Sequence, residues 1–208
     1  MRPPPARLSI SSTCAPVVVG NDTAQANDIF WPGLGRAAIQ VFLAPDMLVS
    51  SITFWKPALP ETLDYPMQFF ITSTESTFSD STTGPNPLPL VTLFASPFFS
   101  VPYTDGVHAK PITIVFNPPF QLPGRGYYAF AIKDASCSGF VDLLGDTLNS
   151  YPYGAVWKSI PKNDCSGLGD SWDRIAYGGW DLIFQIAFCE IGSPAIRETW
   201  GSLKARYR

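Results

Sequence analysis

Aromatic side chains among polar loop residues are the groups in this sequence whose types and spacing could do chemistry. Trp172, Tyr177 and Trp180 fall within nine residues, and Tyr153 and Trp157 lie shortly before them. A flat aromatic face exposed beside polar groups can stack on a sugar ring or anchor a protein partner. We therefore expect these five residues to bind a ligand, although each could instead pack in the core at one end of the fold.

Catalytic residues are harder to find. Any Ser/His/Asp or Cys/His mechanism would have to use His108, the single histidine, which follows a turn-forming Asp105-Gly106 pair and is better explained as a solvated loop residue. A glycosidase needs two carboxylates across a cleft. Aspartates at strand ends and turns usually hydrogen-bond the backbone, so the sequence favours a protein that is not an enzyme. The glycosidase candidates, whose separation the sequence does not fix, are Asp142, Asp146, Asp170, Asp173 and Asp181.

A calcium site is a further hypothesis for the segment 163–173. Its three carboxylates, Asp164, Asp170 and Asp173, are oxygen ligands of the kind that Ca²⁺ prefers. Their spacing is not that of an EF-hand, and a solvated loop held by a disulfide explains the same residues without a metal. No other cofactor is expected.

The four cysteines are spaced as a disulfide framework rather than as a zinc site. Cys137 and Cys165 both begin Cys-Ser-Gly turns, which favours their pairing, and a bond from Cys14 to Cys189 would tie the first segment to the last strand. Such bonds persist only in oxidising compartments, so they predict a secreted or cell-surface protein. Four buried free thiols are the alternative.

Composition excludes several classes of protein. The 14 basic and 17 acidic residues give a net charge of −3, so no broad positive field attracts nucleic acid. Charged residues make up 15% of the chain and hydrophobic residues 46%, which argues against disorder. No apolar run has the length of a membrane span, and the 21 prolines and 16 glycines leave little room for helices.

Period-two alternation predicts an all-β fold. Nine runs bounded by Pro, Gly, Asn or Asp have the residue types of strands, without intervening helices. This pattern favours an antiparallel two-sheet sandwich, jelly-roll-like, over residues 38–191. The polar segments 73–89 and 159–179 are expected to be loops, which could carry function or be tolerated insertions. The predicted strands are 38–43, 48–55, 67–72, 90–94, 112–116, 127–132, 139–144, 155–158 and 181–188.

The two ends differ from this central region. Residues 1–37 are expected to form an N-terminal extension and a first edge segment. Met1 to Pro16 has no apolar stretch of signal-peptide length, so the sequence either starts after a removed signal or begins at a misplaced start codon. Residues 192–208 are predicted to form a short amphipathic helix, a tail that either packs on the sandwich or docks on a partner. Its apolar stripe is Ile196, Trp200, Leu203 and Tyr207.

Several runs together resemble predicted secreted bacterial β-sandwich surface domains of unassigned function. The matching runs are Gln40 to Pro45 followed by Ser51 to Trp55, Pro118 to Ile132, Tyr151 to Trp157, and Asp181 to Phe184. The final Thr199-Trp200-Gly201-Ser202-Leu203-Lys204-Ala205-Arg206-Tyr207-Arg208 is similar to a tail in related sequences. The resemblance implies export and a sandwich fold, and it carries no catalytic residues.

These features predict an exported, non-catalytic module that binds a glycan or an extracellular protein. A structural or assembly domain that attaches through its C-terminal tail is the alternative, followed by a polysaccharide-acting hydrolase. The oligomeric state is not specified by the sequence.

Overall fold

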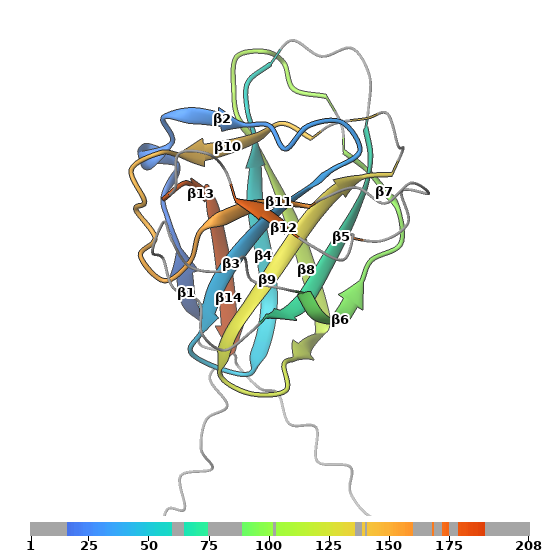
Figure 1. Cartoon of the computed structure of the whole chain (residues 1–208), viewed down its shortest axis with the longest axis vertical. Coiled ribbons are helices and arrows are strands. Elements are labelled where there is room, and N and C mark those ends of the chain that lie inside the picture. Colours follow the sequence, from blue (N-terminus) through green and yellow to red (C-terminus); the bar gives the residue numbers. More distant parts are fainter. Residues whose placement is uncertain are drawn as a thin grey trace, which may run out of the picture.

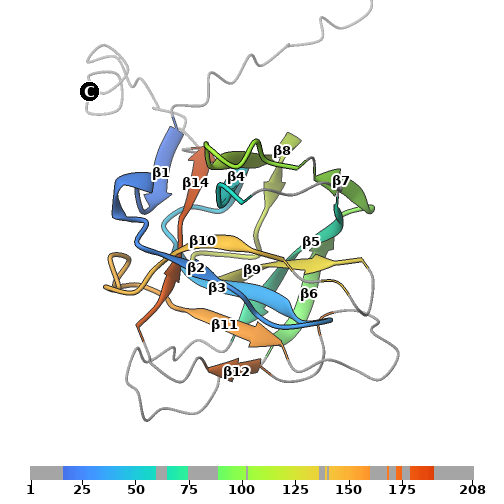
Figure 2. The same cartoon turned by 90° about the horizontal axis from the view of Figure 1, so that it is seen from above.

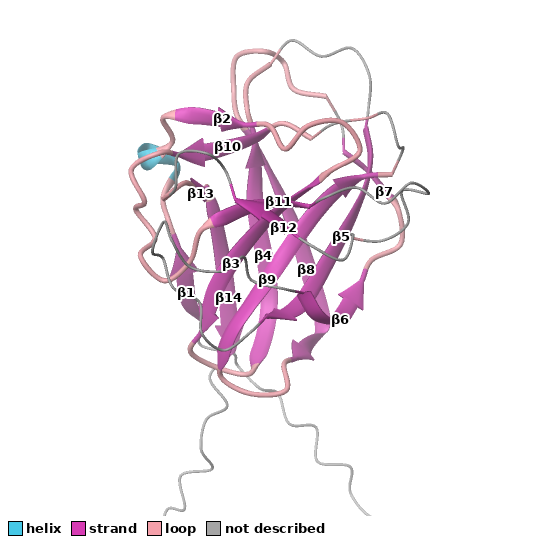
Figure 3. Cartoon of the chain, in the orientation of Figure 1, coloured by secondary structure: helices cyan, strands magenta, loops and turns pink. Residues whose placement is uncertain are grey.

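The structure is a computed structural model in which antiparallel strands form nearly all the regular structure (Figures 1 and 3). It describes residues 16–59, 65–74, 89–101, 103–135, 139, 141–159, 168, 172–174 and 179–189. One 3₁₀ turn, η1 (Thr23–Gln25), is the helical element of this part of the chain. The strands are β1 (Pro16–Gly20), β2 (Asp28–Phe30), β3 (Ala37–Ala44), β4 (Leu48–Lys56), β5 (Tyr65–Thr74), β6 (Pro89–Ala95), β7 (Phe99–Val101), β8 (Lys110–Gln121), β9 (Gly126–Asp134), β10 (Leu143–Asp146), β11 (Val156–Ser159), β12 (Trp172–Arg174), β13 (Asp181–Leu182) and β14 (Phe184–Cys189).

These strands form two large sheets and one small one. A four-stranded sheet has the order β1-β14-β4-β8, and a seven-stranded sheet has the order β12-β11-β3-β9-β5-β6, with β7 also paired to β5. The two lie as separate layers when the molecule is viewed from above (Figure 2). The small sheet, β13-β10-β2, lies across one end of them.

Aromatic rings fill the space between the two large sheets. Phe130 of β9 lies 5.4 Å from Phe184 of β14, measured between ring centroids, and Phe54 of β4 stacks on Phe69 of β5 at 6.4 Å. Because each contact joins one sheet to the other, the rings fix the separation of the layers. The fully buried residues of this core include Phe42, Ile52, Phe54, Phe69, Ile71, Phe130, Ile132, Phe184, Ile186 and Phe188.

The seven-stranded sheet is apolar on its outer face as well. Ile39 and Val41 of β3 point away from the main core and pack with Ala131 of β9 and with Trp157 of β11. Leu168 joins the same cluster from the segment that follows β11. Burial on both faces explains why β3 and β9 are nearly continuous apolar runs rather than strict alternations.

Eight strands form four antiparallel pairs that are nested in the sequence. β1 pairs with β14, β3 with β9, β4 with β8, and β5 with β6. The first and third pairs belong to the four-stranded sheet, and the second and fourth belong to the seven-stranded sheet. The chain therefore passes repeatedly from one layer to the other, and its first strand pairs with its last.

Three phenylalanine rings pack the edge strands β6 and β8 against each other. The ring of Phe94 in β6 lies 5.3 Å from that of Phe116 and 5.7 Å from that of Phe120, both of which belong to β8. Each strand ends the order of its sheet, so the triad closes the space between the layers on this side.

The predicted all-β, antiparallel class is confirmed, and so are the six long strands from 38 to 132. The short strands β1, β2, β7 and β12 were not predicted: residues 16–37 supply two of them, and β12 lies within the segment 159–179 that was expected to be a loop. The run 139–144 begins its pairing only at Leu143, and the run 181–188 divides at Ile183 into β13 and β14. The predicted C-terminal helix lies outside the described residues, in which no helix is long and apolar enough to cross a membrane.

Replacing Phe130 with Ala should destabilise the fold strongly. Its ring contacts Phe42 and Phe69 as well as Phe184, and truncating a buried phenylalanine typically costs about 3–5 kcal/mol. Denaturant unfolding measures the effect. The control is Val115→Ala in β8, where the side chain is 69% exposed and the expected change is below about 0.5 kcal/mol. Equal losses in the two variants would contradict the assignment of the core.

Candidate functional site

A cleft lies between the edge strand β1 and the loop that joins β10 to β11. Both of these elements lie on the left of Figure 1. We call the cleft the aromatic cleft. Its volume is about 360 Å³, within the range of small-molecule sites. Most of its surface is apolar, and a serine hydroxyl and a tyrosine hydroxyl stand among the apolar groups. The lining residues are Val18, Val19, Gly20, Leu43, Pro45, Ser150, Tyr151, Pro152 and Tyr153.

Two tyrosines with opposite exposure form the aromatic wall. Tyr153 is 54% exposed, and its ring packs edge-on against that of Tyr151 with centroids 5.9 Å apart. Tyr151 is 4% exposed; its ring meets Phe184 of the core at 5.0 Å, and its hydroxyl accepts a hydrogen bond from the N–H of Leu43. Burial raises the pKa of Tyr151 to about 12, so this phenol stays neutral. Tyr153 is thus an exposed ring held on a buried one.

The carboxylate of Asp146, the last residue of β10, holds the beginning of the loop between β10 and β11. It is buried and accepts hydrogen bonds from the backbone N–H groups of Leu148 and Ser150, each at 2.9 Å, and from the side-chain amide of Asn27 at 2.7 Å. Burial alone would raise the pKa of Asp146, but these hydrogen bonds and that of the Ser150 hydroxyl outweigh it and hold the pKa below its usual value. The charged carboxylate therefore favours one loop conformation.

A second buried carboxylate, Asp181, holds the middle of the same loop. It accepts hydrogen bonds from the backbone N–H of Tyr151 and from the side-chain amide of Gln40, both at 3.0 Å. The side-chain oxygen Oε1 of Gln40 in turn accepts a hydrogen bond from the N–H of Leu182, at the point where the chain leaves the small sheet for the four-stranded one. Just beyond, the N–H of Phe184 donates to the side chain of Asn21. Side-chain oxygens thus satisfy backbone donors where strand pairing changes.

Gly154 lets the loop approach β3 closely. A Cβ atom at this position would lie 1.9 Å from the carbonyl oxygen of Val41 and 3.1 Å from the ring of Tyr151. The next residue, Ala155, accepts a hydrogen bond from the N–H of Val41. Only glycine fits between Tyr153 and this contact, so the loop is seated directly on the sheet.

The other predicted ligand-binding residues do not gather at this cleft. Trp157 was expected to bind a ligand, but it is 1% exposed. It packs instead in the apolar cluster on the outer face of the seven-stranded sheet. Trp180 is half-buried and packs edge-on against Phe30 at 6.4 Å. Trp172 lies in β12, opposite Ser159 of β11, and Tyr177 lies outside the described residues. Among the members of the five whose side chains the structure describes, Tyr153 lines the aromatic cleft.

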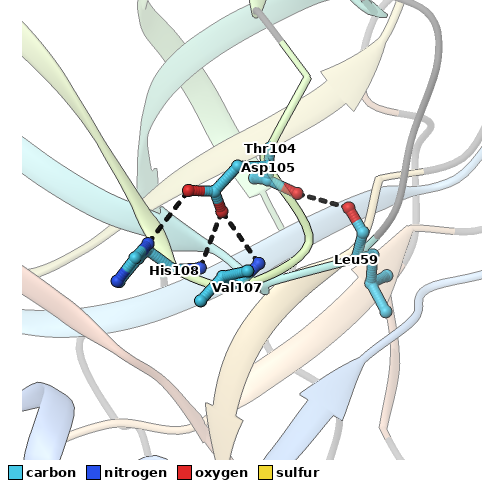
Figure 4. A network of polar contacts seen from close by, with 5 residues as sticks. All are labelled: Leu59, Thr104, Asp105, Val107 and His108. Carbon is cyan, nitrogen blue, oxygen red and sulfur yellow. Dashed lines mark hydrogen bonds and ion pairs between the residues drawn. The ribbon is translucent and has the colours of Figure 1, made fainter.

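His108 belongs to a separate turn, shown in Figure 4. Asp105 accepts hydrogen bonds from the backbone N–H groups of Val107 and His108, and its second oxygen lies 2.9 Å from Nδ1 of His108. The His108 hydrogen bonds, followed by that of Val107, lower the pKa of Asp105. The adjacent Thr104 hydroxyl is committed to the carbonyl of Leu59, so it is not poised as a nucleophile.

The same turn lies beside a wider hollow of about 480 Å³. The His108 and Asp105 side chains are 80% and 58% exposed there, and the expectation of a solvated histidine is confirmed. This openness gives the pair neither the burial nor the packed support that the aromatic cleft has.

The carboxylates proposed for catalysis or calcium binding are dispersed. Asp146 and Asp181 hydrogen-bond the backbone as expected, while Asp173 lies in β12 opposite Lys158 rather than in a loop. Asp164 and Asp170 lie outside the described residues, and within the described ones no three metal-ligating side chains cluster. The calcium site stays a hypothesis.

Cys189, the last residue of β14, is disulfide-bonded. Cys14, Cys137 and Cys165 lie outside the described residues, so the predicted pairings stay predictions. The partner strand of β14 begins at Pro16, which lies directly opposite Cys189.

Sequence reasoning missed most of the cleft. Val18 to Gly20 are positioned by the pairing of β1 with β14, and Leu43 reaches the cleft from β3 of the seven-stranded sheet. The Tyr151-Pro152-Tyr153-Gly154 run was the one available signal, since a proline and a glycine beside two tyrosines mark an aromatic turn.

Replacing Asp146 with Asn should destabilise the protein by about 1–3 kcal/mol near neutral pH, because an amide would point a donor at the N–H groups now bound to the carboxylate. The lowered pKa makes this stabilisation fully present above about pH 4, the unfolded-state value, and lost as the pH falls through the folded-state pKa. Denaturant unfolding from neutral to acidic pH should therefore show the wild-type and variant curves converging. Asp28→Asn, an exposed position, is the control; a constant gap at all pH values would contradict the role of Asp146.

Gly154→Ala should cost about 1–3 kcal/mol, since the added methyl group forces the loop away from Val41. Gly124→Ala is the matched control, because a Cβ there meets no atom within 4 Å. Thermal unfolding of both variants measures the difference; an unchanged Gly154 variant would show that the loop is not seated on β3.

The aromatic cleft thus presents one exposed ring on a loop whose first half is hydrogen-bonded to two buried carboxylates and whose far end is seated on β3. Comparisons of the chain with protein-family models, with curated proteins and with solved structures give no match.

Proposed function

We propose that the protein is an exported, non-catalytic binding module of the jelly-roll sandwich type, and that it binds carbohydrate in the aromatic cleft. The fold assignment rests on the four nested strand pairs that alternate between two facing sheets, which is the pattern of a rolled antiparallel ribbon. Export is supported by the disulfide at Cys189, since such bonds are rare in reducing compartments.

The exposed ring of Tyr153 is the observation that carries the carbohydrate proposal. It is 54% exposed and lines the cleft together with Ser150, and its partner Tyr151 is buried against the core. A sugar ring offers a face of C–H groups to an aromatic ring and hydroxyls to nearby polar groups, so it matches this combination. Because the loop is anchored before a ligand arrives, little ordering entropy is lost on binding.

An extended, proline-rich peptide of an extracellular protein is the second candidate. Pro45 and Pro152 flank the tyrosines, and aromatic-lined grooves recognise such peptides. Among the described strands, β1 ends the order of its sheet beside the cleft, and such an edge can pair with an extended chain. Carbohydrate is favoured because Tyr153 stands singly exposed, whereas peptide grooves of this kind use a series of exposed rings.

Binding to a panel of insoluble polysaccharides, with calcium and with chelator, tests the proposal. Tyr153→Ala should lower the affinity about tenfold, since an aromatic contact of this kind is worth about 0.5–1.5 kcal/mol, whereas Tyr153→Phe should retain it. Tyr103→Ala is the matched control, because Tyr103 is 55% exposed and lines the other hollow.

The outcomes separate the candidates. Binding that Tyr153→Ala loses and Tyr103→Ala keeps would establish the glycan site. Retention of a proline-rich peptide by the wild type, with no glycan bound, would replace it with the second candidate. Equal loss in the two alanine variants, or binding of neither ligand, would overturn the assignment of the cleft.

A further inference from the structure

Asn21-Asp22-Thr23, directly after β1, matches the Asn-x-Ser/Thr acceptor of N-linked glycosylation. Thr23, which supplies the hydroxyl of this pattern, is exposed at the start of η1, and that hydroxyl donates only to the neighbouring Asp22. A sequence of this kind is normally modified where it lies on a surface loop. The position of the asparagine itself is different.

The side chain of Asn21 is a structural part of the folded chain. The residue is 5% exposed; its Oδ1 accepts the N–H of Phe184 at 2.8 Å, and its Nδ2, the atom that would carry a glycan, donates to the Ser150 hydroxyl at 3.3 Å. Its backbone N–H also donates to the carbonyl of Phe184. At the preceding Gly20, a Cβ atom would lie 2.0 Å from that carbonyl oxygen, so there is no room to move the chain aside.

We propose that Asn21 is a glycosylation acceptor controlled by folding, open in the unfolded chain and closed once β14 pairs with β1. Phe184 follows Asn21 by 163 residues, so during synthesis the acceptor emerges long before the strand that buries it. In the modification, an N-glycosidic bond forms between Nδ2 and the anomeric carbon of a lipid-diphosphate-linked oligosaccharide. The bond from that carbon to the diphosphate breaks, and one proton leaves Nδ2.

A glycan at Nδ2 would prevent the fold from closing. Because Nδ2 faces the Ser150 hydroxyl, the attached sugar would occupy the space of Ser150. Asn21 could then not keep its place against Phe184, so the pairing of β14 with β1 and the loop of the aromatic cleft would lose this support. Modification and folding are therefore competing fates of the same chain.

Transfer of an oligosaccharide to the full-length chain in vitro tests this directly. The folded protein and the reduced, denatured protein are each incubated with oligosaccharyltransferase and its lipid-linked donor, and occupancy of Asn21 is read by peptide mass spectrometry. We expect at least about tenfold higher occupancy in the denatured chain, since a folded domain exposes its buried groups only rarely.

Two substitutions of the exposed Thr23 give matched controls that leave Asn21 in place. Thr23→Ser keeps the acceptor pattern and should behave as the wild type, whereas Thr23→Val removes it and should abolish modification. Expressed in a eukaryotic secretory pathway, Thr23→Val should be secreted; of the wild type and Thr23→Ser, the molecules glycosylated at Asn21 should be retained and the unmodified molecules secreted. Equal occupancy in folded and denatured chains, no modification of the denatured chain, or secretion of a folded, Asn21-glycosylated wild type would each overturn the proposal.

Discussion

Two buried carboxylates impose the constraint on which the rest of this structure depends. Asp146 and Asp181 lie beside an apolar core, where an uncompensated charge would cost several kcal/mol. Backbone N–H groups of the loop between β10 and β11 compensate them, together with the side-chain amides of Asn27 and Gln40. The loop thus supplies hydrogen-bond donors that both buried carboxylates require. This requirement fixes the conformation of the loop and with it the shape of the aromatic cleft.

The aromatic core and the cleft are one continuous system. Phe184 packs against Phe130 of the facing sheet on one side and against Tyr151 on the other, and Tyr151 in turn supports Tyr153. Disturbing the contact between the layers therefore reaches the exposed ring through two intermediate rings. The exposed ring of Tyr153 is therefore supported by the packing between the two large sheets and not by the loop alone.

The long strands could be predicted from the sequence because their alternation reports a buried face directly. Runs such as that of β4 carry period-two patterns that no helix would show. β3 and β9 could also be predicted, but from a different pattern. They are nearly continuous apolar runs, because an outer cluster buries their second face as well. Turn residues around each run then set the boundaries.

The short strands and the cleft could not be predicted, because distant pairing rather than local pattern creates them. β2 has three residues and acquires its form from β10, while Val18 gains a place in a cleft only when β1 meets β14. Trp157 was misassigned because the sequence does not show that the seven-stranded sheet is covered on both faces. Asp146 and Asp181 were correctly expected to bind the backbone, but the identity of their partners depends on the tertiary fold.

The division of the last strand at Ile183 has a mechanical consequence. Asp181 and Leu182 pair in the small sheet, and Phe184 and the residues after it pair in the four-stranded sheet. One continuous segment of chain therefore belongs to both sheets. The N–H of Ile183 itself donates to Leu144 of β10 at the crossing point. Shearing one sheet past the other would have to stretch the peptide chain, which is far stiffer than any hydrogen bond. The small sheet should therefore resist sliding past the four-stranded sheet at this end of the molecule.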